Sequence, residues 1–271
     1  MRVGAVTELR RGANLVTQQI RKQVKLRRGA GPVPEARLDA LLEEHADGHS
    51  TVFVHVGLSD VNAAFDANPY EFLLRKLDAH FESIIVPGFT DYFETSGVYH
   101  KQYSRPKHGT FGVLFLEDAD YRTDDAMKSL LVKGPYRFED CVHDDSYHED
   151  GCFSKLVEDD VLVMDIGTPW ITCSHLHYFE QAFDVDYMVE RTFDGVVVSD
   201  EEVREVEQTC HQYDSMFYMW NKPRLERLLS RRGSLSKYDL NGLNVLFFQL
   251  GDLEAALGEK LSEDGYYLVK L

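Results

Sequence analysis

The sequence lacks long apolar runs. Across its 271 residues, no apolar run approaches the roughly 18 residues that a membrane-spanning helix needs, so we expect no transmembrane helix. The N-terminus also lacks the apolar stretch that marks a secretory signal peptide. We therefore expect a cytoplasmic protein.

Cysteine is scarce and scattered. The four cysteines, Cys141, Cys152, Cys173 and Cys210, show no CxxC spacing. This pattern indicates reduced thiols rather than a disulfide framework. No cysteine and histidine set has the spacing of a structural zinc site, and we expect no bound metal.

Basic residues are fewer than acidic ones. The chain has 29 Lys and Arg against 46 Asp and Glu, a net charge of −17. Nucleic-acid binding needs a basic footprint, so we expect no nucleic-acid partner. A large negative charge is compatible with high solubility, with a cationic substrate or with a cytoplasm of high salt concentration.

The basic residues gather at the N-terminus. Residues 1–30 carry eight Lys and Arg against one glutamate, a charge of +7 that leaves −24 for the rest. Leu9, Val16, Ile20 and Val24 could form an apolar stripe among them. Such a segment suits weak contact with an anionic membrane surface. The alternative, which we favour, is packing against the acidic body of the same chain.

Two parts of unequal size follow from this distribution. Residues 1–34 form a basic segment and a breaker-rich linker, and residues 35–271 form an α/β domain. Strands and helices alternate along the domain, which predicts an α/β fold. Strands are expected at 51–56, 83–87, 129–132, 161–166, 193–198, 243–250 and 266–270, and helices at 35–44, 68–82, 172–183, 201–210, 222–230 and 253–261.

The stretch Thr172–Gln181 carries the clearest chemical pattern. Residues three apart share a helical face, which aligns Ser174, His177 and Glu180. A histidine followed by a carboxylate at this spacing suits a general base and its orienting partner. The alternative is a capped helix with surface histidines. An acyl-cysteine route through Cys173 is a lesser alternative.

A histidine-rich loop raises the question of a metal site. His143 and His148 lie in the acidic loop 141–151, and they could converge with His175 and His177. No pair shows an HExxH or similar zinc pattern, so a hydrated acidic loop is the favoured interpretation. The long segment 91–112, rich in Tyr and His, is expected to be a loop that contacts substrate.

Several segments, ordered along the chain, fit one pattern. They are 54–59 (VHVGLS), 86–90 (VPGFT), 109–112 (GTFG), 122–129 (RTDDAMKS), 148–153 (HEDGCF) and 174–180 (SHLHYFE). Together they resemble the aminoglycoside 3-N-acetyltransferase family, and the last segment resembles its TxxHxxE motif. The resemblance covers roughly residues 38–271.

The resemblance implies a layered α/β/α core around a mixed central sheet, with a smaller subdomain. It implies acetyl-CoA as donor and an amine, usually on an aminosugar or aminoglycoside, as acceptor. His177 would be the base and Glu180 its partner. Donor contacts would come from His55, Val56, Gly57, Leu58, Ser59, Thr90 and Ser129, and acceptor contacts from Asp124, Asp125 and Ser174.

Some positions depart from the family pattern. Ser174 replaces threonine but keeps the hydroxyl, and Gly57 stands where the family prefers serine. Ala126, His148 and Gly151 also differ, which leaves the substrate open. A catalytically silent relative that binds CoA or a sugar is one alternative, and a metal-dependent hydrolase is another. A homodimer is compatible with the sequence.

Overall fold

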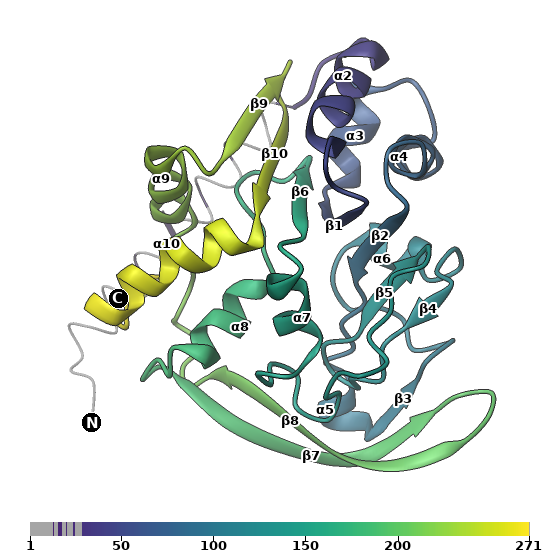
Figure 1. Ribbon diagram of the computed structural model, residues 1–271, viewed down its shortest axis with the longest axis vertical. Coiled ribbons are helices and arrows are strands. Elements are labelled where there is room, and N and C mark those ends of the chain that lie inside the picture. Colours follow the sequence, from purple (N-terminus) through teal and green to yellow (C-terminus); the bar gives the residue numbers. More distant parts are fainter. Residues whose placement is uncertain (1–12, 14–15, 18–19, 21–23, 25–28, 271) are drawn as a thin grey trace.

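A mixed seven-stranded sheet forms the centre of the molecule (Figure 1). The computed structural model describes residues 13, 16–17, 20, 24 and 29–270. Most of the basic segment 1–30 therefore lies outside the described residues, and so does its predicted membrane contact. In sheet order the strands are β4 (Tyr121–Arg122), β5 (Leu130–Lys133), β2 (Ser83–Pro87), β1 (Thr51–Val56), β6 (Leu162–Ile166), β10 (Leu243–Gln249) and β9 (Ser236–Leu240).

Helices cover both faces of this sheet. β1 pairs in parallel with β2 and with β6, whereas β4, β5, β9 and β10 join antiparallel. The helices are α2 (Glu35–Ala46), α3 (Leu58–Ala64), α4 (Pro69–Asp78), α5 (Phe93–Ser96), α6 (Thr110–Phe115), α7 (Cys152–Glu158), α8 (His175–Ala182), α9 (Lys222–Arg232) and α10 (Leu250–Glu263).

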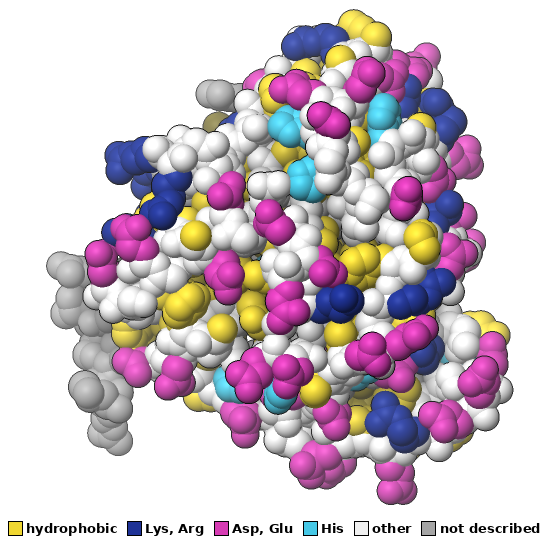
Figure 2. Space-filling model, viewed as in Figure 1, with side chains coloured by type: hydrophobic (Ala, Val, Ile, Leu, Met, Phe, Trp, Pro, Cys, Tyr) yellow, Lys and Arg dark blue, Asp and Glu magenta, His cyan; other side chains and the backbone are white. Residues whose placement is uncertain are grey.

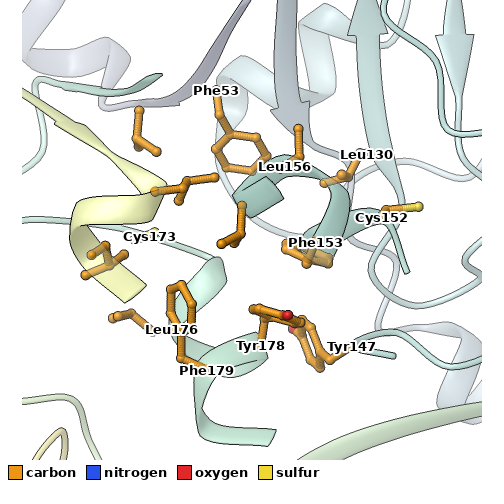
Figure 3. Packing of buried hydrophobic residues seen from close by; sticks show 14 of the residues in the cluster. Phe53, Leu130, Tyr147, Cys152, Phe153, Leu156, Cys173, Leu176, Tyr178 and Phe179 are labelled. Atoms are coloured by element: carbon orange, nitrogen blue, oxygen red, sulfur yellow. The ribbon is translucent and has the colours of Figure 1, made fainter. Parts of the chain in front are cut away.

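Two hydrophobic cores follow from the strand period of two. In β1, Phe53 packs into one core, while Val52 and Val54 pack into the other. The first core joins the sheet to α7, α8, α9 and α10, and the second joins it to α2, α3, α4 and α6. Figure 3 shows Phe53, Phe153 and Phe179 in the first core. This confirms the layered α/β/α core.

A three-stranded sheet lies apart from the central one. It contains β3 (Val98–His100), β7 (Met188–Val198) and β8 (Val203–Tyr213), and β7 and β8 form a long antiparallel hairpin (Figure 1). The expected helix over 201–210 is therefore wrong. Val206, Gln208 and Cys210 alternate with exposed glutamates and face inward. Polar Gln208 at a buried position obscured this period of two.

Two further expectations need correction. The expected strand over 266–270 is a turn-rich segment that pairs through one bridge, between Val269 and Trp220. Leu268 and Val269 are both buried, so the segment packs on both sides instead of extending a sheet. The expected loop 91–112 contains α5, β3 and the start of α6. In the described part of the chain, no helix is long and apolar enough to cross a membrane.

The ends of β1 and β6 meet at the centre of the sheet. His55 on β1 lies directly across from Asp165 on β6. Beyond the strands, Gly57 and Gly167 touch so closely that a Cβ atom on Gly57 would lie 2.1 Å from the Gly167 carbonyl oxygen. Parallel strands tend to hold ligands at their carboxyl ends, and the polar residues described next lie there.

Candidate active site

His177 and Glu180 lie one turn apart on α8. Nδ1 of His177 is 2.8 Å from Oε2 of Glu180, which is the pairing that their spacing predicts. The carboxylate is fully buried, whereas a quarter of the His177 side chain is exposed. A buried acceptor thus faces one side of an imidazole whose other side is open to solvent.

Glu180 accepts hydrogen bonds from several donors at once. Besides His177, the hydroxyl of Tyr187 (2.9 Å) and the indole Nε1 of Trp220 (2.8 Å) donate to Oε1. The Tyr213 hydroxyl lies 3.2 Å from the same oxygen. Hydrogen bonds to a carboxylate favour its charged form. These donors therefore replace the hydration that the Glu180 carboxylate loses inside the core.

This arrangement selects one tautomer of His177. A proton on Nδ1 can donate to Glu180, which leaves the lone pair of Nε2 as an acceptor. The ring of Trp220 lies 4.5 Å from the His177 ring, centroid to centroid, and helps to hold its orientation. The geometry suits a general base whose free nitrogen faces the adjoining space.

Two cavities meet at His177. The first, of about 340 Å³, is rich in aromatic side chains. The second, of about 390 Å³, runs along the ends of β1 and β2. Four residues line both: Thr168, Thr172, His177 and Trp220. Two small molecules could therefore approach the same imidazole from different cavities.

A second histidine, His55, lines the second cavity and has the buried carboxylate of Asp165 behind it. Nε2 of His55 is 3.1 Å from the Ser174 hydroxyl oxygen. On the other side of the ring, Nδ1 lies 3.2 Å from Oδ1 of Asp165, although the N–H does not point along that line. The backbone N–H of Thr172 donates to Asp165 at 2.6 Å. Burial raises the pKa of Asp165, against the opposing effect of His55.

The residues predicted to contact the acetyl donor divide into two groups. His55 and Val56 line the second cavity, whereas Gly57, Leu58 and Ser59 do not. The N–H of Gly57 already donates to the Ile166 carbonyl at 2.8 Å. An N–H group that already donates in this way is not available to stabilise the oxyanion of an acyl transfer.

Thr90 and Ser129 lie in the framework behind the second cavity. The Thr90 hydroxyl donates to the Ala126 carbonyl at 2.7 Å, and the Ser129 hydroxyl donates to the Gly88 carbonyl at 2.8 Å. Both residues are almost completely buried and line neither cavity. Both side chains therefore support the 88–90 turn. A direct contact of either residue with acetyl-CoA stays a prediction.

The acidic residues that were predicted to contact the amine acceptor line neither cavity. Asp124 pairs with Lys101, and Asp125 is buried, where Oδ1 accepts from the backbone N–H groups of Met127 and Lys128. Burial raises the pKa of Asp125 to about 6 despite these bonds. Ser174, in contrast, lines the second cavity, and its contact with the acceptor stays a prediction.

The histidines considered for a metal site do not converge. His175 is fully buried between Phe53 and Phe153, with ring centroids 5.0 Å from each. His143 bonds to the Phe138 carbonyl, far along the chain from His177. No group of three His, Cys, Asp or Glu side chains in the described ranges could hold a metal ion.

Several site residues were not found from the sequence. Asp91 lines the second cavity with Lys128 and His108, whose nitrogens lie 2.6 and 2.8 Å from its oxygens. Burial alone would raise the pKa of Asp91, but His108 and Lys128 hold this pKa well below its usual range. Asp165 had a signal, since it is a lone charge within an apolar strand.

The comparisons with known proteins give the family and the fold of this chain. The family described as aminoglycoside 3-N-acetyltransferase matches residues 90–261. A search of curated proteins finds no match. Among solved structures, the aminoglycoside acetyltransferase AAC(3)-Xa superposes with a TM-score of 0.69 and 17% identity, over 90% of this chain and 98% of that one.

Two further similar structures hold ligands. AAC-IIIb, solved as a binary complex with CoASH, has a TM-score of 0.66 and 14% identity, over 83% of this chain and 96% of its own. AAC-VIa, bound to sisomicin, has a TM-score of 0.65 and 14% identity, over 86% and 98%. At such identities the superpositions establish a shared fold.

Proposed function

This chain belongs to the aminoglycoside 3-N-acetyltransferase family, a family of acyltransferases, and we propose that it transfers an acetyl group from acetyl-CoA to an amine. The acceptor we propose is an aminosugar or an aminoglycoside-like molecule. The observation that carries the proposal is the buried Glu180, which orients His177 where the two cavities meet.

His177 supplies the base that an amine acceptor requires. An alkylamine is mostly protonated at neutral pH, with a reference pKa of about 10.4, and must lose a proton before it attacks a thioester. Nε2 of His177 takes that proton, directly or through water, while Glu180 stabilises the resulting imidazolium. General-base help of this kind contributes roughly 10²–10⁴-fold.

The two cavities suit different substrates. The first presents Trp170, Trp220, Tyr213 and Tyr218. Aromatic faces suit the stacking of a sugar ring and the cation–π attraction of an ammonium group. The second, along the strand ends with His55 and Val56, suits the pantetheine arm and thioester of the donor. A structural relative in complex with CoASH supports a CoA donor.

A thiol-release assay tests the proposal directly. Acetyl-CoA and a panel of aminosugars and aminoglycosides are supplied to the wild type and to His177→Ala. We expect CoA release that depends on an amine in the wild type and a loss of about 10²–10⁴-fold in the variant. Mass spectrometry of the product identifies the acetylated amine.

A matched variant separates the base from its surroundings. Tyr178→Phe changes a neighbouring residue of α8 that lines neither cavity, and it should retain turnover. Equal release from the wild type and His177→Ala would remove His177 from the role of base. CoA binding by calorimetry without turnover of any amine would instead identify a silent binder, and no CoA binding would contradict the choice of donor.

A further inference from the structure

Ser174 has a hydrogen-bonded histidine and a carboxylate of its own. Its hydroxyl oxygen lies 3.1 Å from Nε2 of His55, and Nδ1 of the same ring lies 3.2 Å from Oδ1 of Asp165. This order of hydroxyl, imidazole and buried carboxylate is the arrangement that activates a serine nucleophile. It is separate from the pair formed by His177 and Glu180.

Two neighbouring strands and the start of a helix place these three groups. His55 and Asp165 face each other on neighbouring parallel strands, and Ser174 immediately precedes α8. Asp165 is fully buried, and its Oδ2 accepts from the Thr172 N–H. The contact between His55 and Asp165 is off the ideal hydrogen-bond direction, which is common for catalytic groups before substrate binds.

Serine is a better candidate for the nucleophile than the cysteine beside it. Ser174 is 9% exposed and lines the second cavity next to His55 and His177. Cys173 is completely buried, and burial raises the pKa of its thiol well above the ordinary value. Its thiolate is therefore scarce, and the thiolate is the reactive form.

We propose that Ser174 accepts the acyl group from an acyl thioester or activated ester and then releases it to water. The chain thus has an acceptor-independent esterase and thioesterase activity beside amine acetylation. The choice of acetyl-CoA as a natural donor rests on the proposed function. The chemistry of Ser174 does not, because an activated ester supplies the same acyl group.

The reaction balances within these groups. His55 Nε2 takes the Ser174 hydroxyl proton as the oxygen attacks the carbonyl carbon. The carbon–sulfur bond then breaks, and the leaving thiolate takes the proton from His55 and departs as a free thiol. A water molecule then attacks the serine ester, again with His55 as base. The ester bond breaks, Ser174 recovers its proton, and acetate leaves.

The position of Ser174 also favours the charge that develops. Attack on the carbonyl produces an oxyanion beside the first turn of α8, which begins at His175. The N-terminus of a helix carries partial positive charge, which stabilises a nearby anion. Asp165 stabilises the imidazolium that forms on His55, as the carboxylate does in a serine triad.

The test uses p-nitrophenyl acetate, a probe that does not need a CoA site. The full chain is mixed with the ester without an amine, quenched and digested, and the peptides are sequenced by mass spectrometry. We expect a burst of p-nitrophenol and an acetyl adduct on Ser174. Ser174→Ala should abolish both, and Asp165→Asn should slow acylation by about 10³–10⁴-fold. Tyr178→Phe, a matched control on α8 that lines neither cavity, should retain the burst and the adduct.

Peptide mapping of the wild type keeps the test independent of variant folding. An adduct on another residue, or none at all under conditions where p-nitrophenol is released, would overturn the proposal. A burst of equal size in folded Ser174→Ala, with folding checked by circular dichroism, would overturn it too. Amine transfer is measured separately with acetyl-CoA, so an adduct on Ser174 without amine transfer would contradict the proposed function alone.

Discussion

At the scale of single residues, the site depends on charges placed where water is excluded. Glu180 is fully buried and accepts from an imidazole, an indole and tyrosine hydroxyl groups. A buried carboxylate is costly unless such donors compensate for its lost hydration. In the proposed function the same carboxylate orients His177 as the base, so stability and catalysis would depend on one side chain.

Replacement of Glu180 by glutamine should therefore damage both properties. The amide has the shape of the carboxylate, but its NH₂ group would face donors and leave them unpaired. We expect unfolding free energy to fall by about 1–3 kcal/mol and kcat to fall by up to about 10²–10⁴-fold. Tyr187→Phe, which removes one donor only, is the control. Unchanged kcat in Glu180→Gln would show that His177 needs no carboxylate partner.

Asp125 provides a pH prediction. Its folded-state pKa of about 6 exceeds that of an unfolded aspartate, so the folded state binds more protons between these values. Its contribution to stability therefore decreases as pH rises from 4 to 6. Relative to Asp125→Asn, the wild type should lose up to about 3 kcal/mol between pH 4 and pH 8. Urea unfolding of both proteins at each pH measures this, and parallel curves would contradict it.

At the scale of secondary-structure elements, the site lies where β1 and β6 end and their connections begin. Gly57 follows β1, Gly167 follows β6, and their backbones lie in direct contact. Gly57 stands where related sequences were expected to carry serine. The close approach to Gly167 gives that departure a physical reason, because no side chain fits between the two backbones.

A methyl group at position 57 should therefore disturb the site. In Gly57→Ala the new Cβ would lie 2.1 Å from the Gly167 carbonyl oxygen, so the turns must move apart. We expect a loss of about 1–3 kcal/mol in unfolding free energy and a raised KM for acetyl-CoA. Gly265→Ala, where a Cβ meets nothing within 4 Å, is the matched control. Equal stability of the two variants in urea would contradict this account.

At the scale of the whole molecule, charge is the dominant feature. The chain carries −17, and acidic side chains are spread over the face in Figure 2. The cavities themselves are less acidic. Among the described residues that line them, Asp91 is the sole carboxylate, and it is already paired with Lys128. Long-range attraction of a cationic acceptor, before it reaches the aromatic side chains of the first cavity, must therefore come from the field of the whole surface.

Such a long-range field should be sensitive to salt. Exposed charges are screened over about 8 Å at physiological ionic strength and about 3 Å at 1 M. We expect KM for a polycationic aminoglycoside to rise several-fold between about 0.05 and about 0.5 M NaCl. KM for a singly charged aminosugar should change less. Parallel responses of the two acceptors would exclude steering by the surface.

Elements with a clear period were predictable from the sequence. The predicted bounds of β1 and β2, 51–56 and 83–87, are the observed ones. Runs of β-branched residues between turn-forming residues favour buried strands. The pairing of His177 with Glu180 follows from the rise of a helix and needs no long-range contact. Hairpin strand β8 was missed because buried Gln208 has its partners, His143 and Ser146, far away in the chain.

The sequence alone determined the α/β alternation, the acidic charge and the pairing of His177 with Glu180, since each depends on composition or on residues within one element. Only the tertiary structure brought Asp165 beside His55 and Ser174, and Trp220 and Tyr213 onto Glu180. These partners come from separate strands, loops and a hairpin. Their contacts depend on sheet order and register, which residues far apart in the chain decide together.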